Sequence, residues 1–164
     1  MLHGAGGTAE AGLRLLLPYA DENALLLYAP QSAGSTWDVI LGRYGPDVDR
    51  IQAALPRLTG PPLAIGGFSD GASYALSLAL TNGDLFDSVI AFSPGFAAPI
   101  ETRGSPRFFI SHGRTDRILP IERCGSRLAR ALRATGYDVE YQEFDGGHEI
   151  PPEVTVAALD WLLR

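Results

Sequence analysis

Short apolar runs alternate along the chain with longer segments whose apolar positions repeat at helical spacing. Continuous apolar runs are typical of strands that are buried on both faces of a parallel sheet. Four such strands are predicted, at residues 25–28, 63–65, 89–92 and 108–110. Residues 139–144 alternate apolar and polar positions, which predicts a more exposed strand at the edge of the sheet.

Helical patterns lie between these runs. Thr8 is a suitable N-cap for a helix whose apolar face carries Leu13, Leu16 and Leu17. Residues 47–58 form a second candidate, and residues 72–80 are apolar nearly all round, which predicts a buried central helix that ends at Asn82-Gly83. Two further helices are predicted from apolar stripes, which comprise Ile121, Cys124, Leu128 and Leu132 in one and Val154, Ala157, Ala158 and Trp161 in the other.

The alternation of strands and helices predicts an α/β fold with a mostly parallel, doubly wound sheet. Ligands of such sheets bind beyond the carboxyl ends of the strands. The 164 residues contain no internal repeat, low-complexity tract or interdomain linker, so residues 1–164 are predicted to form a single domain.

Composition excludes several kinds of chemistry. The formal net charge is −6, which argues against a nucleic-acid partner. All 13 basic residues are Arg, so no lysine is present for a Schiff base or a phosphate-binding loop. Cys124 is the single cysteine, and three histidines are too few for a histidine-rich metal centre. Ser, Asp, Glu and the few His residues remain as candidates for catalysis.

No apolar run approaches the roughly 20 residues that span a bilayer, and the first residues lack the features of a secretory signal. The expected location is therefore the cytoplasm, without a membrane span.

The candidate nucleophile is Ser69. The segment Gly67-Phe68-Ser69-Asp70-Gly71 follows a predicted strand and directly precedes the buried helix. A serine at such a turn presents its hydroxyl above the sheet, and the N–H of Asp70 at the helix start can stabilise an oxyanion. A short Gly-X-Ser-X-Gly pattern also arises by chance, so the interpretation depends on this strand–turn–helix setting. The alternative is an ordinary tight turn.

The candidate acid and base follow Ser69 in the order that this architecture uses, first Asp116 and then His148. Each residue lies in a loop that follows a predicted strand, so both are expected at the same edge of the sheet as Ser69. A serine hydroxyl needs an imidazole to take its proton and a carboxylate to hold that imidazole. Asp145 is a weaker alternative to Asp116, because it is better suited to forming a turn. His112 is expected to hold its turn by hydrogen bonds.

Several motifs together resemble the phospholipase/carboxylesterase family of α/β-hydrolases, and the resemblance covers nearly the whole chain. The motifs are His3-Gly4-Ala5-Gly6-Gly7, Ala29-Pro30-Gln31, the Ser69 turn, His112-Gly113 with Asp116 and Pro120, and Gly147-His148. The resemblance implies esterase activity on small-molecule esters of short or medium acyl chains, without a metal or an organic cofactor. It also implies that the N–H of Ala5 completes the oxyanion hole and that His3 is structural.

Trp37 and Phe68 are assigned to substrate binding. Trp37 falls where members of this family line the acyl cleft, and its alternative role is packing in the core or beneath a lid. No insertion is large enough for a cap domain, so an open site is expected.

Two features differ from the resembled family. Its members carry a central strand directly before the His-Gly loop, whereas only Met1 and Leu2 precede His3 here. Either the natural chain begins earlier, so that this one is N-terminally truncated, or the sheet lacks an interior strand and leaves neighbouring backbone groups unpaired. The second difference is the short link at residues 57–62.

The sequence thus predicts a serine esterase that transfers an acyl group to water. Two alternatives remain, an acyl thioesterase and a hydrolase-fold binding protein with little catalytic activity.

Overall fold

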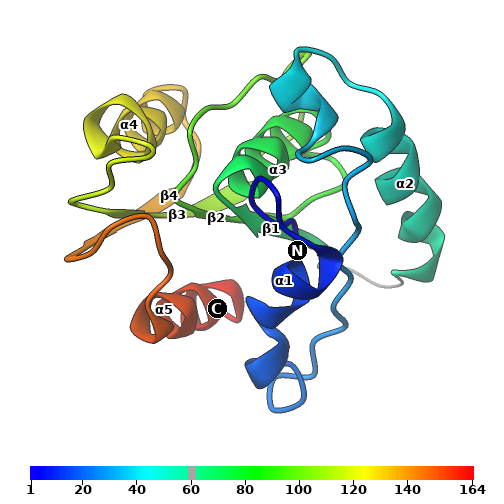
Figure 1. Ribbon diagram of the computed structural model, residues 1–164, viewed down its shortest axis with the longest axis horizontal. Coiled ribbons are helices and arrows are strands. Elements are labelled where there is room, and N and C mark those ends of the chain that lie inside the picture. The colour runs from blue at the N-terminus through cyan, green and yellow to red at the C-terminus, as the bar shows by residue number, and fades with distance from the viewer. Residues whose placement is uncertain (59–61) are drawn as a thin grey trace.

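The computed structural model describes residues 1–58 and 62–164, and its centre is a parallel sheet of four strands (Figure 1). The strands follow one another across the sheet in the order β1-β2-β3-β4. Their bounds are Ala64–Phe68 for β1, Ser88–Phe92 for β2, Arg107–Gly113 for β3 and Val139–Phe144 for β4. All three pairings are parallel, so the four carboxyl ends lie along one edge. The predicted α/β fold is confirmed, and β4 lies at the edge of the sheet as expected.

Helices cover both faces of this sheet (Figure 1). The central helix α3 lies on one face together with α2 and α4, and α1 and α5 lie on the other. In the described residues the α-helices are α1 (Ala9–Arg14), α2 (Pro46–Ala54), α3 (Asp70–Thr81), α4 (Gly125–Ala134) and α5 (Pro152–Leu162).

The core has two parts because successive side chains of a strand point to opposite faces. On β2, Val89 and Ala91 belong to the cluster beneath α3 and α4. Their neighbours Ile90 and Phe92 belong to the cluster against α5. Strands that are buried on both faces in this way explain the continuous apolar runs of the sequence.

Capping residues and apolar stripes in the sequence predicted the positions of most helices correctly. The Thr8 hydroxyl accepts a hydrogen bond from the N–H of Ala11, so Thr8 caps α1 as expected. That helix ends at Arg14, however, and Leu17 is 54% exposed in a following 3-10 turn, so its assignment to the buried face was wrong. Of the short link at residues 57–62, residues 59–61 lie outside the described part of the chain.

Residues 25–28 form no strand, which corrects one prediction. A strand needs a neighbour that exchanges backbone hydrogen bonds with it. In the described part of the chain, Met1 and Leu2 lie between this segment and β1. Leu2 forms an isolated bridge with Gly67, and the terminal nitrogen of Met1 donates to the Tyr28 carbonyl at 2.6 Å. Two residues are too few for a ladder, so within the described residues the sheet has no strand on this side of β1.

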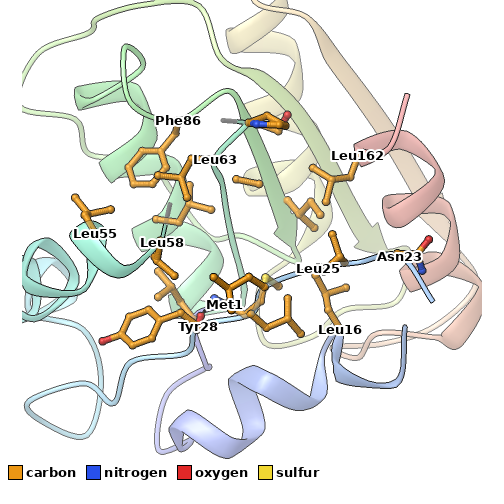
Figure 2. Close-up of a pocket in the computed structure, with 18 of the residues that line it drawn as sticks. Met1, Leu16, Asn23, Leu25, Tyr28, Leu55, Leu58, Leu63, Phe86 and Leu162 are labelled. Carbon is orange, nitrogen blue, oxygen red and sulfur yellow. Dashed lines mark hydrogen bonds between the residues drawn. The ribbon is translucent and has the colours of Figure 1, made fainter. Parts of the chain in front are cut away.

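An apolar groove of about 440 Å³ occupies that space (Figure 2). It lies between β1, residues 25–28 and the end of α5, and Ser69, Asp116 and His148 are not among its lining residues. Residues that line it include Met1, Leu25, Tyr28, Leu55, Leu63 and Leu162. The groove is therefore separate from the carboxyl edge where the candidate catalytic side chains meet.

Candidate active site

Ser69 lies between β1 and α3 in a backbone conformation that residues with side chains rarely adopt. Its φ of 56° and ψ of −119° fall outside the favoured regions for L-amino acids. The turn is held because the Ser69 N–H donates to the Phe92 carbonyl at 2.9 Å. Gly71 lies so close to Leu2 that a Cβ would overlap the Leu2 carbonyl oxygen. These contacts fix a strained turn of the kind that presents a nucleophilic hydroxyl.

His148 connects the serine to a carboxylate. It lies in the loop after β4, with Nε2 at 2.8 Å from Ser69 Oγ and Nδ1 at 2.6 Å from Asp116 Oδ2. A carboxylate only accepts hydrogen bonds, so Nδ1 carries the proton of the neutral ring and Nε2 is left to accept from the serine. The ring is 16% exposed, so it remains within reach of a substrate.

Asp116 is held ionised by the loop that follows β3. The N–H groups of Ile118 and Leu119 both donate to its Oδ1 at 2.9 Å. Burial alone would raise the pKa of this carboxyl. The Leu119 N–H, the His148 ring and the Ile118 N–H together outweigh burial and hold the pKa below its ordinary value. Asp116 is therefore a buried carboxylate whose Oδ2 faces His148.

Asp145, the weaker alternative, lies elsewhere. Its side chain is 91% exposed and forms an ion pair with Arg114 at 2.7 Å. Asp145 is thus a surface residue of the turn, and the structure brings Asp116 to the imidazole instead.

The loop that contains Ala5 packs against Ser69. A Cβ on the neighbouring Gly4 would lie 3.4 Å from Ser69 Cβ. Within the described residues, the N–H groups of Ala5 and Asp70 have no hydrogen-bond acceptor. Gly6, at a φ of 65°, turns the loop, and its N–H donates to the Ser35 carbonyl at 2.6 Å. The loop of Ala5 therefore adjoins Ser69, and the N–H groups of Ala5 and Asp70 are available as hydrogen-bond donors.

His3 supports this loop from beneath and is only 1% exposed. Its Nδ1 donates to the Gly4 carbonyl at 2.8 Å, and its Nε2 accepts from the Ser32 N–H at 3.2 Å. The Gln31 side chain lies 3.2 Å from the same Nε2. These contacts are those of a structural residue, which is the role that the resemblance implied for His3.

Trp37 lies in the core, which corrects its assignment to substrate binding. Its side chain is fully buried, stacks on Tyr74 at 5.3 Å between ring centroids, and donates from Nε1 to the His3 carbonyl at 2.8 Å. Burial beneath the loop leaves no surface for an acyl chain. Phe68, in contrast, is half-buried and packs on the His148 ring at 4.7 Å, so it lies at the candidate site.

Thr36 is a residue of this site that the sequence did not reveal. Its hydroxyl donates to Asp70 Oδ2 at 2.6 Å and so ties its own loop to the first turn of α3. The two residues are 34 positions apart, and no local pattern indicates the contact. Tertiary placement alone brings them together.

The comparisons with known proteins agree with this geometry. A model of the phospholipase/carboxylesterase family matches residues 50–162, a range that contains Ser69, Asp116 and His148. The chain belongs to the phospholipase/carboxylesterase family. It is therefore an α/β-hydrolase, and its family comprises esterases and related hydrolases. Comparison with curated protein sequences finds no match.

Solved structures resemble this family member over nearly its whole length. The esterase PE8 has a TM-score of 0.80 at 24% identity, over 98% of this chain and 88% of PE8. A phospholipase/carboxylesterase from Dyadobacter fermentans has a TM-score of 0.78 at 24% identity, over 100% and 88% of the two chains. Acyl-protein thioesterase 2 from Zea mays has a TM-score of 0.66 at 20% identity, over 98% and 90%. At these identities the similarity establishes the fold alone.

Two further properties concern the described part of the chain. None of its helices is long and apolar enough to cross a membrane. No group of three or more His, Cys, Asp or Glu side chains in residues 1–58 and 62–164 is arranged to hold a metal ion.

Proposed function

We propose that the protein is a serine esterase that hydrolyses carboxylic esters of short to medium acyl chains. The observation that carries this proposal is the hydrogen-bonded series from Ser69 through His148 to Asp116 at the carboxyl edge of the sheet. Family membership supports a hydrolase, and the two amide donors beside the serine support acyl transfer in particular.

In the first half of the proposed reaction, Ser69 Oγ attacks the ester carbonyl carbon while His148 Nε2 takes the hydroxyl proton. The carbonyl oxygen becomes an oxyanion, to which the N–H groups of Ala5 and Asp70 donate. The bond to the alcohol oxygen then breaks, and His148 gives its proton to that oxygen. The alcohol leaves, and the acyl group remains on Ser69.

The second half repeats these steps with water. His148 takes a proton from a water molecule, whose oxygen attacks the acyl carbon and regenerates the oxyanion. Collapse releases the carboxylic acid as the proton returns from His148 to Ser69 Oγ. Asp116 remains ionised throughout, because its carboxylate stabilises the imidazolium that forms in each half.

Turnover of a chromogenic ester series tests the proposal. We expect the protein to hydrolyse p-nitrophenyl acetate and butyrate, and to show lower kcat/KM for matched acyl thioesters. Faster turnover of the thioesters would identify an acyl thioesterase instead. A folded protein that hydrolyses neither class would be a binding protein on a hydrolase fold, which contradicts the proposal.

A further inference from the structure

A second histidine lies against the carboxylate of the candidate site. His112, in β3, is fully buried. Its Nε2 lies 2.7 Å from the Leu119 carbonyl oxygen and 3.2 Å from Asp116 Oδ2. The Leu119 N–H in turn donates to Asp116 Oδ1. His112 therefore contacts both the carboxylate and the peptide segment that binds it.

The surroundings of His112 determine where its proton lies. A carbonyl oxygen only accepts hydrogen bonds, so Nε2 must carry the hydrogen that Leu119 receives. Nδ1 has no hydrogen-bond partner among the described residues, and Gly125 packs so closely that a Cβ there would overlap it. Burial holds the pKa of His112 below its ordinary value. The ring is therefore neutral and has a single proton, on Nε2.

We propose that His112 is a positioning residue for the reaction, whose neutral Nε2–H imidazole holds Leu119 and Asp116 so that the carboxylate meets His148. The inference rests on the proposed esterase function. His112 touches no substrate atom in this scheme, because it is fully buried and acts through Asp116. The Nε2–H is donated to the Leu119 carbonyl, and Nε2 lies 3.2 Å from Asp116 Oδ2. The positive end of this N–H therefore lies close to the carboxylate where both side chains are fully buried and such an interaction is strong.

In the described part of the chain, two other titratable side chains interact electrostatically with Asp116. They are His148, which is its candidate catalytic partner, and Cys124. Burial raises the pKa of the Cys124 thiol, so this group stays neutral. His112 thus adds a buried neutral imidazole beside this carboxylate, in addition to the N–H groups of Ile118, Leu119 and His148.

Two variants separate positioning from simple packing. In His112→Gln, the amide nitrogen can occupy the position of Nε2 and donate to the Leu119 carbonyl. The side chain of His112→Asn is one methylene shorter, so its amide nitrogen cannot reach that position. We expect His112→Asn to lower kcat for p-nitrophenyl butyrate by roughly 10- to 100-fold, the size of effect that a misplaced catalytic group produces, with KM changed by less than about twofold. His112→Gln is expected to restore most of the rate. A folded His112→Asn protein with the wild-type kcat would overturn the inference, as would equal losses in both variants.

The wild-type protein offers a measurement that does not depend on the folding of any variant. Nitrogen NMR of histidine-labelled protein distinguishes the two ring tautomers, and the chain has three histidines. We expect His3 and His148 to carry their proton on Nδ1, and His112 alone to carry it on Nε2. A proton on Nδ1 of His112 would overturn the inference, because Nε2 could not then donate. If the wild-type protein hydrolysed no ester, the proposed function would be refuted, whereas the tautomer result would still stand.

Discussion

Replacing Ser69 with Ala is expected to lower kcat/KM for p-nitrophenyl butyrate by at least about 10³-fold. The serine oxygen forms the bond to the acyl group, so its loss removes the acyl-enzyme route and leaves only water attack assisted by the oxyanion donors. Steady-state hydrolysis by purified wild type and variant measures the change. The fold should persist, because Ala introduces no atom that the turn does not already hold.

Ser111→Ala is the matched control. Ser111 is a buried serine of β3 whose hydroxyl has no hydrogen-bond partner among the described residues, so its removal leaves no group unsatisfied. We expect this variant to keep the wild-type rate. Comparable rates for wild type and Ser69→Ala would mean that another residue performs the reaction.

Gly71→Ala is expected to lower the stability of the folded protein strongly. A Cβ at this position would overlap the carbonyl oxygens of Leu2 and His3, which belong to the backbone and cannot rotate away. Helix α3 must therefore move away from the oxyanion loop, at a cost of roughly 3 kcal/mol. The free energy of unfolding in urea, together with the esterase rate, measures both consequences.

Gly147→Ala provides the comparison, because a Cβ there meets nothing within 4 Å. Its free energy of unfolding should stay within about 1 kcal/mol of the wild-type value. If Gly71→Ala were as stable as Gly147→Ala, the close approach of α3 to Leu2 and His3 would not be a feature of the folded protein.

Much of the site could be predicted from sequence because its residues follow strands. Parallel strands end at one edge, so residues that directly follow them meet there even when they are far apart in the chain. Ser69 and His148 are 79 positions apart, and the structure places them 2.8 Å apart. Asp116 was preferred to Asp145 because Asp145 is better suited to forming a turn, and the structure brings Asp116 to His148.

The incorrect or missing predictions concern residues whose structure depends on tertiary packing. Residues 25–28 have the composition of a strand, but a strand also requires a partner. Among the residues that the structure describes, the isolated bridge of Leu2 lies between them and β1 in place of a strand. Trp37 had two roles that the sequence could not separate, because a large aromatic side chain serves in a cleft or in a core. Its stacking on Tyr74, far along the chain, places it in the core. The contact of Thr36 with Asp70 is likewise formed only in the folded chain.

Covalent labelling tests the central claim, that Ser69 is an activated nucleophile, most directly. The protein is incubated with a fluorophosphonate, digested, and analysed by mass spectrometry to locate the adduct. We predict one adduct per chain, on Ser69, which is absent from Ser69→Ala and forms much more slowly in His148→Asn. An adduct on another residue, or ester hydrolysis by a protein that takes up no label, would contradict the account.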